Sequence, residues 1–280
     1  MTEILMKFAS FFLVIYSSLS FSATADHWER MQERTGVPDP TGVHHVQEHA
    51  IAAYDSGDLK GAFGWFTKWA KEFGNPYGQF RLANMYFNGL GVAKDHEKAA
   101  AWFLESAKQG YRTSQDRLAM MYLKGQGVPQ NFSNAAEWFR KAAEENAETN
   151  LKAEESNPES NVHSFQVTDI QTQSDAQISL AILYRDGRGV EQSDSIAFQW
   201  FRKAADQGDG FAQASIGEMY EAGRGTEQNV EEAYKWYRMA ADQGDTVAQR
   251  HLARFYSEGI GVLKNESEAN KWLRLAEEEE

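Results

Sequence analysis

The sequence contains no cysteine, which excludes disulfide bonds, cysteine nucleophiles and cysteine-ligated zinc or iron–sulfur sites. It also lacks an excess of basic residues, because 28 Lys and Arg against 41 Asp and Glu give a net charge of −13. This acidity disfavours sequence-independent binding to nucleic acid, which needs a basic surface. With 5 proline and 22 glycine residues in 280, the chain is neither collagen-like nor of low complexity. Aromatic residues make up 13% and apolar residues 42%, which is typical of a folded, soluble protein.

Long apolar runs are absent except near the N-terminus. Residues 8–21 form a 14-residue apolar stretch after Lys7, shorter than the roughly 20 residues that span a bilayer. The Ala23-Thr-Ala25 sequence that follows has the small-residue pattern of a signal-peptide cleavage site. We therefore predict a signal peptide at 1–25 and an exported protein, periplasmic or secreted, with no stable membrane anchor after cleavage. An uncleaved N-terminal anchor is the alternative.

The rest of the chain repeats itself every 36 residues. A recurring tyrosine occurs at Tyr86, Tyr122, Tyr184, Tyr220 and Tyr256, with intervals of 36, 62, 36 and 36. Tryptophans follow the same spacing at Trp102, Trp138, Trp200, Trp236 and Trp272. So do the Gly-x-Gly pairs Gly89/Gly91, Gly125/Gly127, Gly187/Gly189, Gly223/Gly225 and Gly259/Gly261. A glutamine lies seven residues before each tyrosine, and the interval of 62 indicates an insertion of 26 residues.

Each copy is expected to form two helices. Apolar or small residues at −8, −4, −3, −1 and 0 from the tyrosine fill one arc of a first helix. The glycine pair then supplies a turn, where glycine permits a positive φ. A capping residue precedes the second helix, namely Asp95, Asn131, Ser193, Asn229 or Asn265. The second helix carries the tryptophan, which we expect in the core, and ends near Gly110, Gly208 or Gly244 in three copies.

These pairs are too small to bury their apolar faces alone, so they are expected to stack. The predicted fold is all-α, an α-solenoid (right-handed superhelix) of antiparallel helix pairs. We divide the chain into a lead-in at 26–42, a degenerate N-terminal copy at 43–73, copies at 74–110, 111–146, 173–208, 209–244 and 245–280, and an insertion at 147–172. The charged Glu277 replaces the alanine of the other copies and is expected to face water.

The pattern Leu-Ala-x-Met-Tyr-x-x-Gly-x-Gly-Val…Ala-x-x-Trp-Phe-x-x-Ala-Ala-x-x-Gly resembles Sel1-like repeats, relatives of tetratricopeptide repeats with a longer inter-helix turn. It is clear in 82–110 and 216–244, and the resemblance covers 74–146 and 173–280. It implies a protein–protein interaction module, of a type that is often secreted or periplasmic in bacteria. Some cysteine-rich Sel1-like proteins are linked to β-lactam binding, but this chain lacks their cysteines.

The insertion permits several interpretations. Asn146 stands where other copies have a terminating glycine, so the second helix of copy 2 is expected to continue to Glu155 before a break at 156–160. Residues 162–170 then carry several apolar side chains. This segment either folds back on the solenoid, orders on a partner as an arm, or is disordered.

Catalytic and metal-binding patterns are weak. His44, His45 and His49 are the best metal candidates, but Glu48 is misplaced for a His-Glu-x-x-His site and no third ligand is evident. Neither Gly-x-Ser-x-Gly nor Ser-x-x-Lys occurs. We therefore predict no catalytic residues, no metal, no cofactor and no enzyme activity. The alternatives are a cell-wall-related hydrolase or β-lactam-binding enzyme, and a structural component of an envelope or secretion assembly.

A partner would bind on the face that stacking leaves unused. Positions −5, −2 and +2 from the tyrosine vary between copies in charge and size. The candidate partner-binding residues are Arg81, Asn84, Arg117, Met120, Lys124, Ile182, Asp186, Glu218, His251 and Arg254. The basic Arg81, Arg117 and Lys124 suggest that the first copies of a monomeric solenoid hold an acidic protein or peptide segment on its concave face. Unconstrained surface variation is the alternative.

Overall fold

The computed structural model describes residues 42–144 and 162–278, and within these ranges the chain forms twelve α-helices joined by turns, without strands. An N-terminal helix pair is formed by α3 (Val43–Asp55) and α4 (Leu59–Glu72). The five copies follow as α5 (Pro76–Asn88) and α6 (His96–Lys108), α7 (Arg112–Lys124) and α8 (Phe132–Ala143), α10 (Val162–Asp186) and α11 (Asp194–Asp206), α12 (Gly210–Ala222) and α13 (Val230–Ala241), and α14 (Thr246–Glu258) and α15 (Glu266–Glu278).

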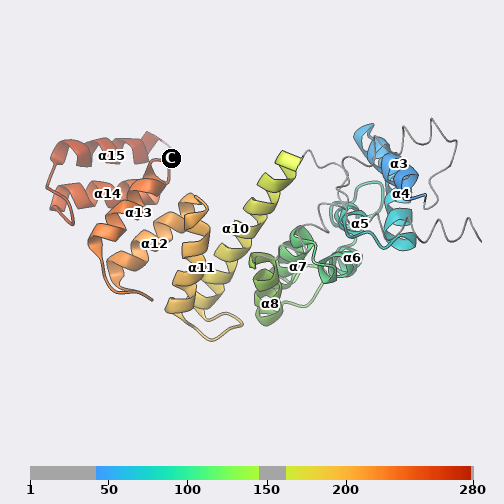
Figure 1. Cartoon of the computed structure of the whole chain (residues 1–280), viewed down its shortest axis with the longest axis horizontal. Helices are drawn as coiled ribbons and strands as arrows, with labels where there is room; N and C mark the ends of the chain where they lie inside the picture. The colour runs from blue at the N-terminus through green and yellow to red at the C-terminus, as the bar shows by residue number, and fades with distance from the viewer. Residues whose placement is uncertain (1–41, 145–161, 279–280) are drawn as a thin grey trace, which may run out of the picture.

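The helix pairs stack in series along a curved body (Figure 1). Each helix packs against the next one along the chain, from α3 and α4 at one end to α14 and α15 at the other. First helices of neighbouring copies also touch, as α7 and α10 or α12 and α14 do. The expected all-α solenoid is confirmed.

The glycine pair makes the turn inside each copy. Its second glycine also packs against the backbone of the preceding copy. Gly125 ends α7 in the left-handed conformation, with a φ of 69°. Gly127 also has a φ of 69°, and a Cβ there would lie 2.1 Å from the carbonyl oxygen of His96, the first residue of α6. The second glycine is therefore required by its backbone conformation and by the close approach of the preceding second helix.

The same close approach recurs at Gly91, Gly189 and Gly225, which have the positive φ expected of the turn. Each faces the first residue of the preceding second helix. A Cβ on Gly91 would lie 2.0 Å from the carbonyl oxygen that begins α4, and one on Gly225 would lie 2.2 Å from the carbonyl oxygen that begins α11. On Gly189 it would lie 2.2 Å from the carbonyl carbon that begins α8. These glycines are contacts between copies as well as turn residues.

Polar side chains fix the helix starts and the junctions between copies. The expected caps are confirmed, because Asp95, Asn131, Ser193, Asn229 and Asn265 each accept a hydrogen bond from a backbone N–H in the first turn of a second helix. The repeated glutamine links copies: Gln213 Nε2 donates to the carbonyl of Ala205 at 3.2 Å, and its Oε1 accepts from Gln243 at 2.8 Å. Gln177 makes the same two bonds, to the carbonyl of Ala143 and from Gln207, so these two buried amides are bonded to the preceding second helix and to their own.

In the first four copies the residue after the tryptophan is almost fully buried, whereas Leu273 in the fifth copy is 42% exposed. Phe103, Phe139, Phe201 and Tyr237 are at most 1% exposed. Trp236 and Trp272 are buried, but Trp102, Trp138 and Trp200 are only half-buried, so the expectation of a fully buried tryptophan in every copy is corrected. The ammonium groups of Lys141 and Lys203 lie 4.1 Å from the ring centroids of Trp138 and Trp200, which shows that these indoles reach the surface beside solvated cations.

The junction between copies 2 and 3 differs from the expected one. Helix α8 ends at Ala143 because Glu144 adopts an extended backbone, so it does not run on unbroken towards Glu155. Helix α10 begins at Val162, so 162–172 extends the first helix of copy 3 by several turns rather than forming a separate segment. The expectations for the signal peptide, the lead-in at 26–41 and the insertion at 147–161 lie outside the described residues. Glu277 is exposed, as expected.

Candidate functional site

The candidate partner-binding residues fall into three groups on the first helices. Four of them, Asn84, Arg117, Met120 and Lys124, line one pocket between α5 and α7. Three others, Glu218, His251 and Arg254, lie in one ionic network between α12 and α14. The remaining three lie apart from both places.

The α5–α7 pocket has a volume of about 180 Å³ and joins an apolar interior to a basic rim. Its apolar lining comes from Phe87, Phe103, Met120 and Met121. Arg117 and Lys124 are exposed at the rim, two turns apart on α7. Neither forms a hydrogen bond or an ion pair with another residue in the described ranges. The pocket therefore presents two cations that form no ion pair within those ranges, beside a small apolar hollow.

Side-chain amides complete the lining of this pocket from α5 and from the turn after α7. Asn84 and Asn88 donate their amide hydrogens to backbone carbonyls one turn earlier on α5, at 3.1 and 3.0 Å. Gln126 contributes a third amide. Because the asparagines bond to their own helix, they do not cross the pocket to Arg117 and leave it open.

The equivalent place between α12 and α14 is occupied by an ionic network. The Glu221 carboxylate accepts a hydrogen bond from Tyr237 Oη at 2.9 Å, pairs with Arg254 and lies 3.3 Å from His251 Nδ1. The His251 ring stacks on Tyr237 at 4.4 Å, and Glu218 lies 4.0 Å from its Nε2. Burial opposes ionisation of Glu221, but the bonds from Arg254 and Tyr237 outweigh it and lower its pKa. Burial and the bond to Glu221 raise the pKa of Tyr237, which stays protonated as the donor.

The last three candidates have local partners. The Arg81 guanidinium lies 4.2 Å from the ring centroid of Tyr54 and 5.0 Å from that of Phe66, so it is held by the N-terminal helix pair and does not line the pocket. Ile182 is half-buried and packs on the core of copies 3 and 4. Asp186 pairs with its neighbour Arg185 at 2.8 Å.

Sequence reasoning missed residues that lie next to the variable positions. Phe87 and Glu221 both follow the repeated tyrosine directly, and both contribute to the sites between first helices. The signal was present, because this position holds Phe, Leu, Arg, Glu and Ser in the five copies. Phe103, Met121 and Tyr237 were missed because they are core residues whose edges also reach these sites.

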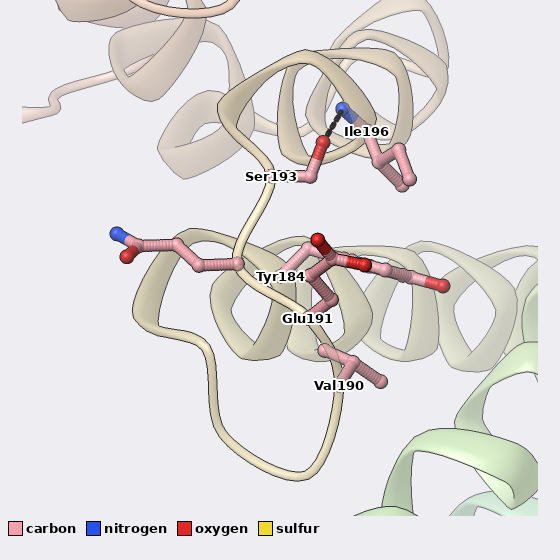
Figure 2. A pocket seen from close by; sticks show the side chains of 6 residues that line it. Tyr184, Val190, Glu191, Ser193 and Ile196 are labelled. Carbon is pink, nitrogen blue, oxygen red and sulfur yellow. Dashed lines mark hydrogen bonds between the residues drawn. The ribbon is translucent and has the colours of Figure 1, made fainter.

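Copy 3 carries a second, shallow pocket of about 550 Å³ at its inter-helix turn (Figure 2). It is lined by Tyr184, Val190, Glu191, Gln192, Ser193 and Ile196. Ser193 accepts a hydrogen bond from the Ile196 N–H at 3.3 Å, so its hydroxyl serves as a helix cap. This lining lacks a histidine or a second carboxylate, so it does not assemble a nucleophile with a base.

The histidines considered as metal ligands form an aromatic stack on the N-terminal pair. The rings of His45 and His49 lie 4.1 Å apart, and His49 lies 4.8 Å from the ring of Trp65. His49 Nδ1 lies 2.7 Å from the His45 carbonyl oxygen. Within 42–144 and 162–278, no group of three or more His, Asp or Glu side chains could hold a metal ion, and no helix is long and apolar enough to cross a membrane.

Stacked two-helix units with repeated packing positions and a variable first-helix surface define a helical-repeat protein of the solenoid class. The Sel1 repeat family model matches five segments, at 76–111, 113–146, 174–209, 210–245 and 246–279. The chain therefore belongs to the Sel1 repeat family. Proteins of this family generally mediate protein–protein interactions and are typically not enzymes.

Two solved structures resemble the whole arrangement. A Sel1 repeat protein from Oxalobacter formigenes is 29% identical, with a TM-score of 0.67 over 82% of this chain and 83% of that one. The protein c5321, a protective antigen present in uropathogenic Escherichia coli strains, displays an SLR fold and is 26% identical, with a TM-score of 0.69. This chain is covered to 93% in that comparison but spans only 50% of the Escherichia coli protein. No curated protein matches the sequence.

Proposed function

We propose that this protein is an exported adaptor that holds a segment of another protein on the concave side of its solenoid. First helices of successive copies touch at two junctions, α7 with α10 and α12 with α14, and helices that lie closest line the inside of a bend. The single observation that carries the proposal is the α5–α7 pocket, where four variable positions meet around an apolar hollow with two cations free of ion pairs. The partner segment is acidic where it meets this pocket.

Export is the second part of the proposal. It rests on the apolar stretch at 8–21 and the small-residue site that ends at Ala25. Fractionation of cells that express the full chain should place the protein outside the cytoplasm. N-terminal sequencing should then read Asp26 as the first residue. A full-length chain that is retained in the cytoplasm would contradict export and leave the binding surface untouched.

Site-specific cross-linking in the native cell tests the binding surface. A photo-reactive amino acid at Met120, in the α5–α7 pocket, should capture a partner that mass spectrometry then identifies. The same amino acid at Met239, which is 46% exposed on α13, serves as the control. Capture of one protein from position 120 and not from position 239 supports the proposal. Equal capture at both positions, or none at 120, contradicts it.

A further inference from the structure

We infer that the α5–α7 pocket binds one apolar side chain of an extended peptide, with an acidic side chain on each side of it along the peptide. This inference rests on the proposed function and names the partner sequence that the pocket would select. It follows from the size of the pocket, from the spacing of its two cations and from the amides opposite them.

The volume of the pocket matches a side chain rather than a cofactor. At about 180 Å³ it is smaller than the pockets of small-molecule ligands, which begin at about 300 Å³. Its interior is formed by Phe87, Phe103, Met120 and Met121. Methionine side chains adapt their shape to the group that packs on them, so leucine, methionine or phenylalanine could fill the hollow.

The two cations set the spacing of the acidic residues. Arg117 and Lys124 are seven residues apart on α7, so their Cα atoms are separated by about 10.5 Å along the helix axis. Met120 and Met121 lie between them and line the pocket. Three residues of an extended chain in the polyproline II conformation cover about 9 Å and bring side chains three positions apart to the same face. A peptide that runs along α7 would therefore place acidic residues three positions apart, with the apolar residue between them.

The opposite wall suits an extended backbone. Asn84 and Asn88 on α5, opposite the two cations, and Gln126 in the turn after α7 present amide groups along the pocket, and amides can pair with the N–H and C=O groups of a peptide that has no internal hydrogen bonds. The charge also favours an acidic peptide here, because neither cation has an ion-pair partner within the described ranges to be displaced. At α12–α14 the equivalent space is filled by the Glu221–Arg254 pair, so the selection would be confined to the first two copies.

Fluorescence anisotropy with defined peptides tests this inference on the full mature chain. The probes are fluorescein-GSELAESG-amide and its counterpart with the order EALE, because either chain direction is allowed. Saturable binding below about 1 mM is expected for at least one of them. Replacing the leucine by alanine, or both glutamates by glutamine, should weaken that binding about tenfold.

Protein variants separate a built site from general charge attraction. The double reversal Arg117→Glu with Lys124→Glu should reduce affinity about tenfold or more. The matched reversal Lys60→Glu with Lys94→Glu changes net charge equally at exposed lysines outside the pocket, and should leave affinity within about twofold. Circular dichroism of both variants confirms that each is folded.

Three outcomes overturn the inference. Equal loss in both double reversals means non-specific attraction. Binding of the free-acid form of either peptide without binding of its amide means that a chain end is recognised rather than an internal segment. No saturable binding of either peptide means that the pocket does not select this pattern. In each case capture at position 120 in the cell can still succeed, so failure of this inference is distinguishable from failure of the proposed function.

Discussion

The α5–α7 and α12–α14 junctions occupy the same place in the repeat and have opposite character. In both, positions −2 and +1 of one copy face positions −5 and −2 of the next. The first junction brings Asn84 and Phe87 to Arg117 and Met120 and leaves a pocket. The second brings Glu218 and Glu221 to His251 and Arg254 and closes the space with ion pairs. The repeat therefore determines the backbone, while these four positions determine whether a junction is open to a partner.

The two junctions also treat charge differently. Glu221, Tyr237 and Arg254 satisfy one another, so the C-terminal network contributes to stability but offers little to a ligand. Arg117 and Lys124 form no ion pair within the described residues, so they contribute little to stability and can pair with an acidic partner. If this comparison is right, substitutions in the C-terminal junction should affect mainly folding, and substitutions in the N-terminal junction should affect mainly binding.

The largest expected effect tests how closely the turn glycines pack against the preceding copy near the two ends of the solenoid. A Cβ on Gly127 would lie 2.1 Å from the His96 carbonyl oxygen, whereas a Cβ on Gly261 would lie 3.2 Å from that of Val230. Both glycines have a positive φ. Gly127→Ala should therefore lower the free energy of unfolding by about 3 kcal/mol, from overlap plus backbone strain, and Gly261→Ala by about 1 kcal/mol, from strain alone. If urea unfolding gave equal decreases in the free energy of unfolding for the two variants, the copies would pack equally closely at both junctions.

The next effect concerns Asp116 on α7, whose carboxylate lacks an ion pair among the described residues. Burial raises its pKa to about 6, opposed by Arg117 and reinforced by Asp175. Since the unfolded value is about 3.9, the folded state binds the proton more tightly and stability should fall as pH rises from about 4 to 6. Asp116→Asn should remove this fall and be about 1–2 kcal/mol more stable than the natural chain at pH 7.

Urea midpoints between pH 4 and pH 7.5 measure the effect of Asp116→Asn. Glu221 supplies the contrasting control, because its pKa is lowered in the folded state. Its contribution to stability is present above the unfolded pKa of about 4.3 and is lost as pH falls through the folded value. Glu221→Gln should therefore weaken the acid-side loss and leave the slope between pH 4 and 6 in place. A parallel pH profile for the natural chain and Asp116→Asn would refute the assignment.

A matched pair of arginine substitutions gives the third effect. Arg254→Ala removes a partner of the half-buried Glu221 and should lower the free energy of unfolding by about 1 kcal/mol. Arg117→Ala removes a side chain with no ion pair and should change it by less than about 0.5 kcal/mol. Thermal unfolding of both variants measures the difference. If Arg117→Ala proved the more destabilising, the division between a structural and a binding junction would be wrong.

The repeat architecture could be predicted from the sequence because its packing positions recur at a fixed spacing. Glycine pairs, capping residues and apolar arcs all indicated the same two-helix unit. The end of α8 could not be predicted, because only the extended conformation of Glu144 decides it. The pocket could not be predicted either, although the variable positions that line it were identified. Whether Arg117 stays unpaired depends on Asn84, which lies 33 positions earlier and bonds to its own helix instead.

The smallest expected effect on stability gives the sharpest test of the comparison. Asn84 is the counterpart of Glu218, so Asn84→Glu would place a carboxylate opposite Arg117, as Glu218 lies opposite His251. A partly exposed pair of this kind should change the free energy of unfolding by less than about 0.5 kcal/mol. The affinity for the peptide in which leucine is flanked by glutamates should nevertheless fall about tenfold, because the new carboxylate at position 84 would neutralise Arg117. Asn270→Glu, an equal charge change on α15, should leave affinity unchanged. If Asn84→Glu bound the peptide as tightly as the natural chain, then charge at these four positions would not decide which junction is open.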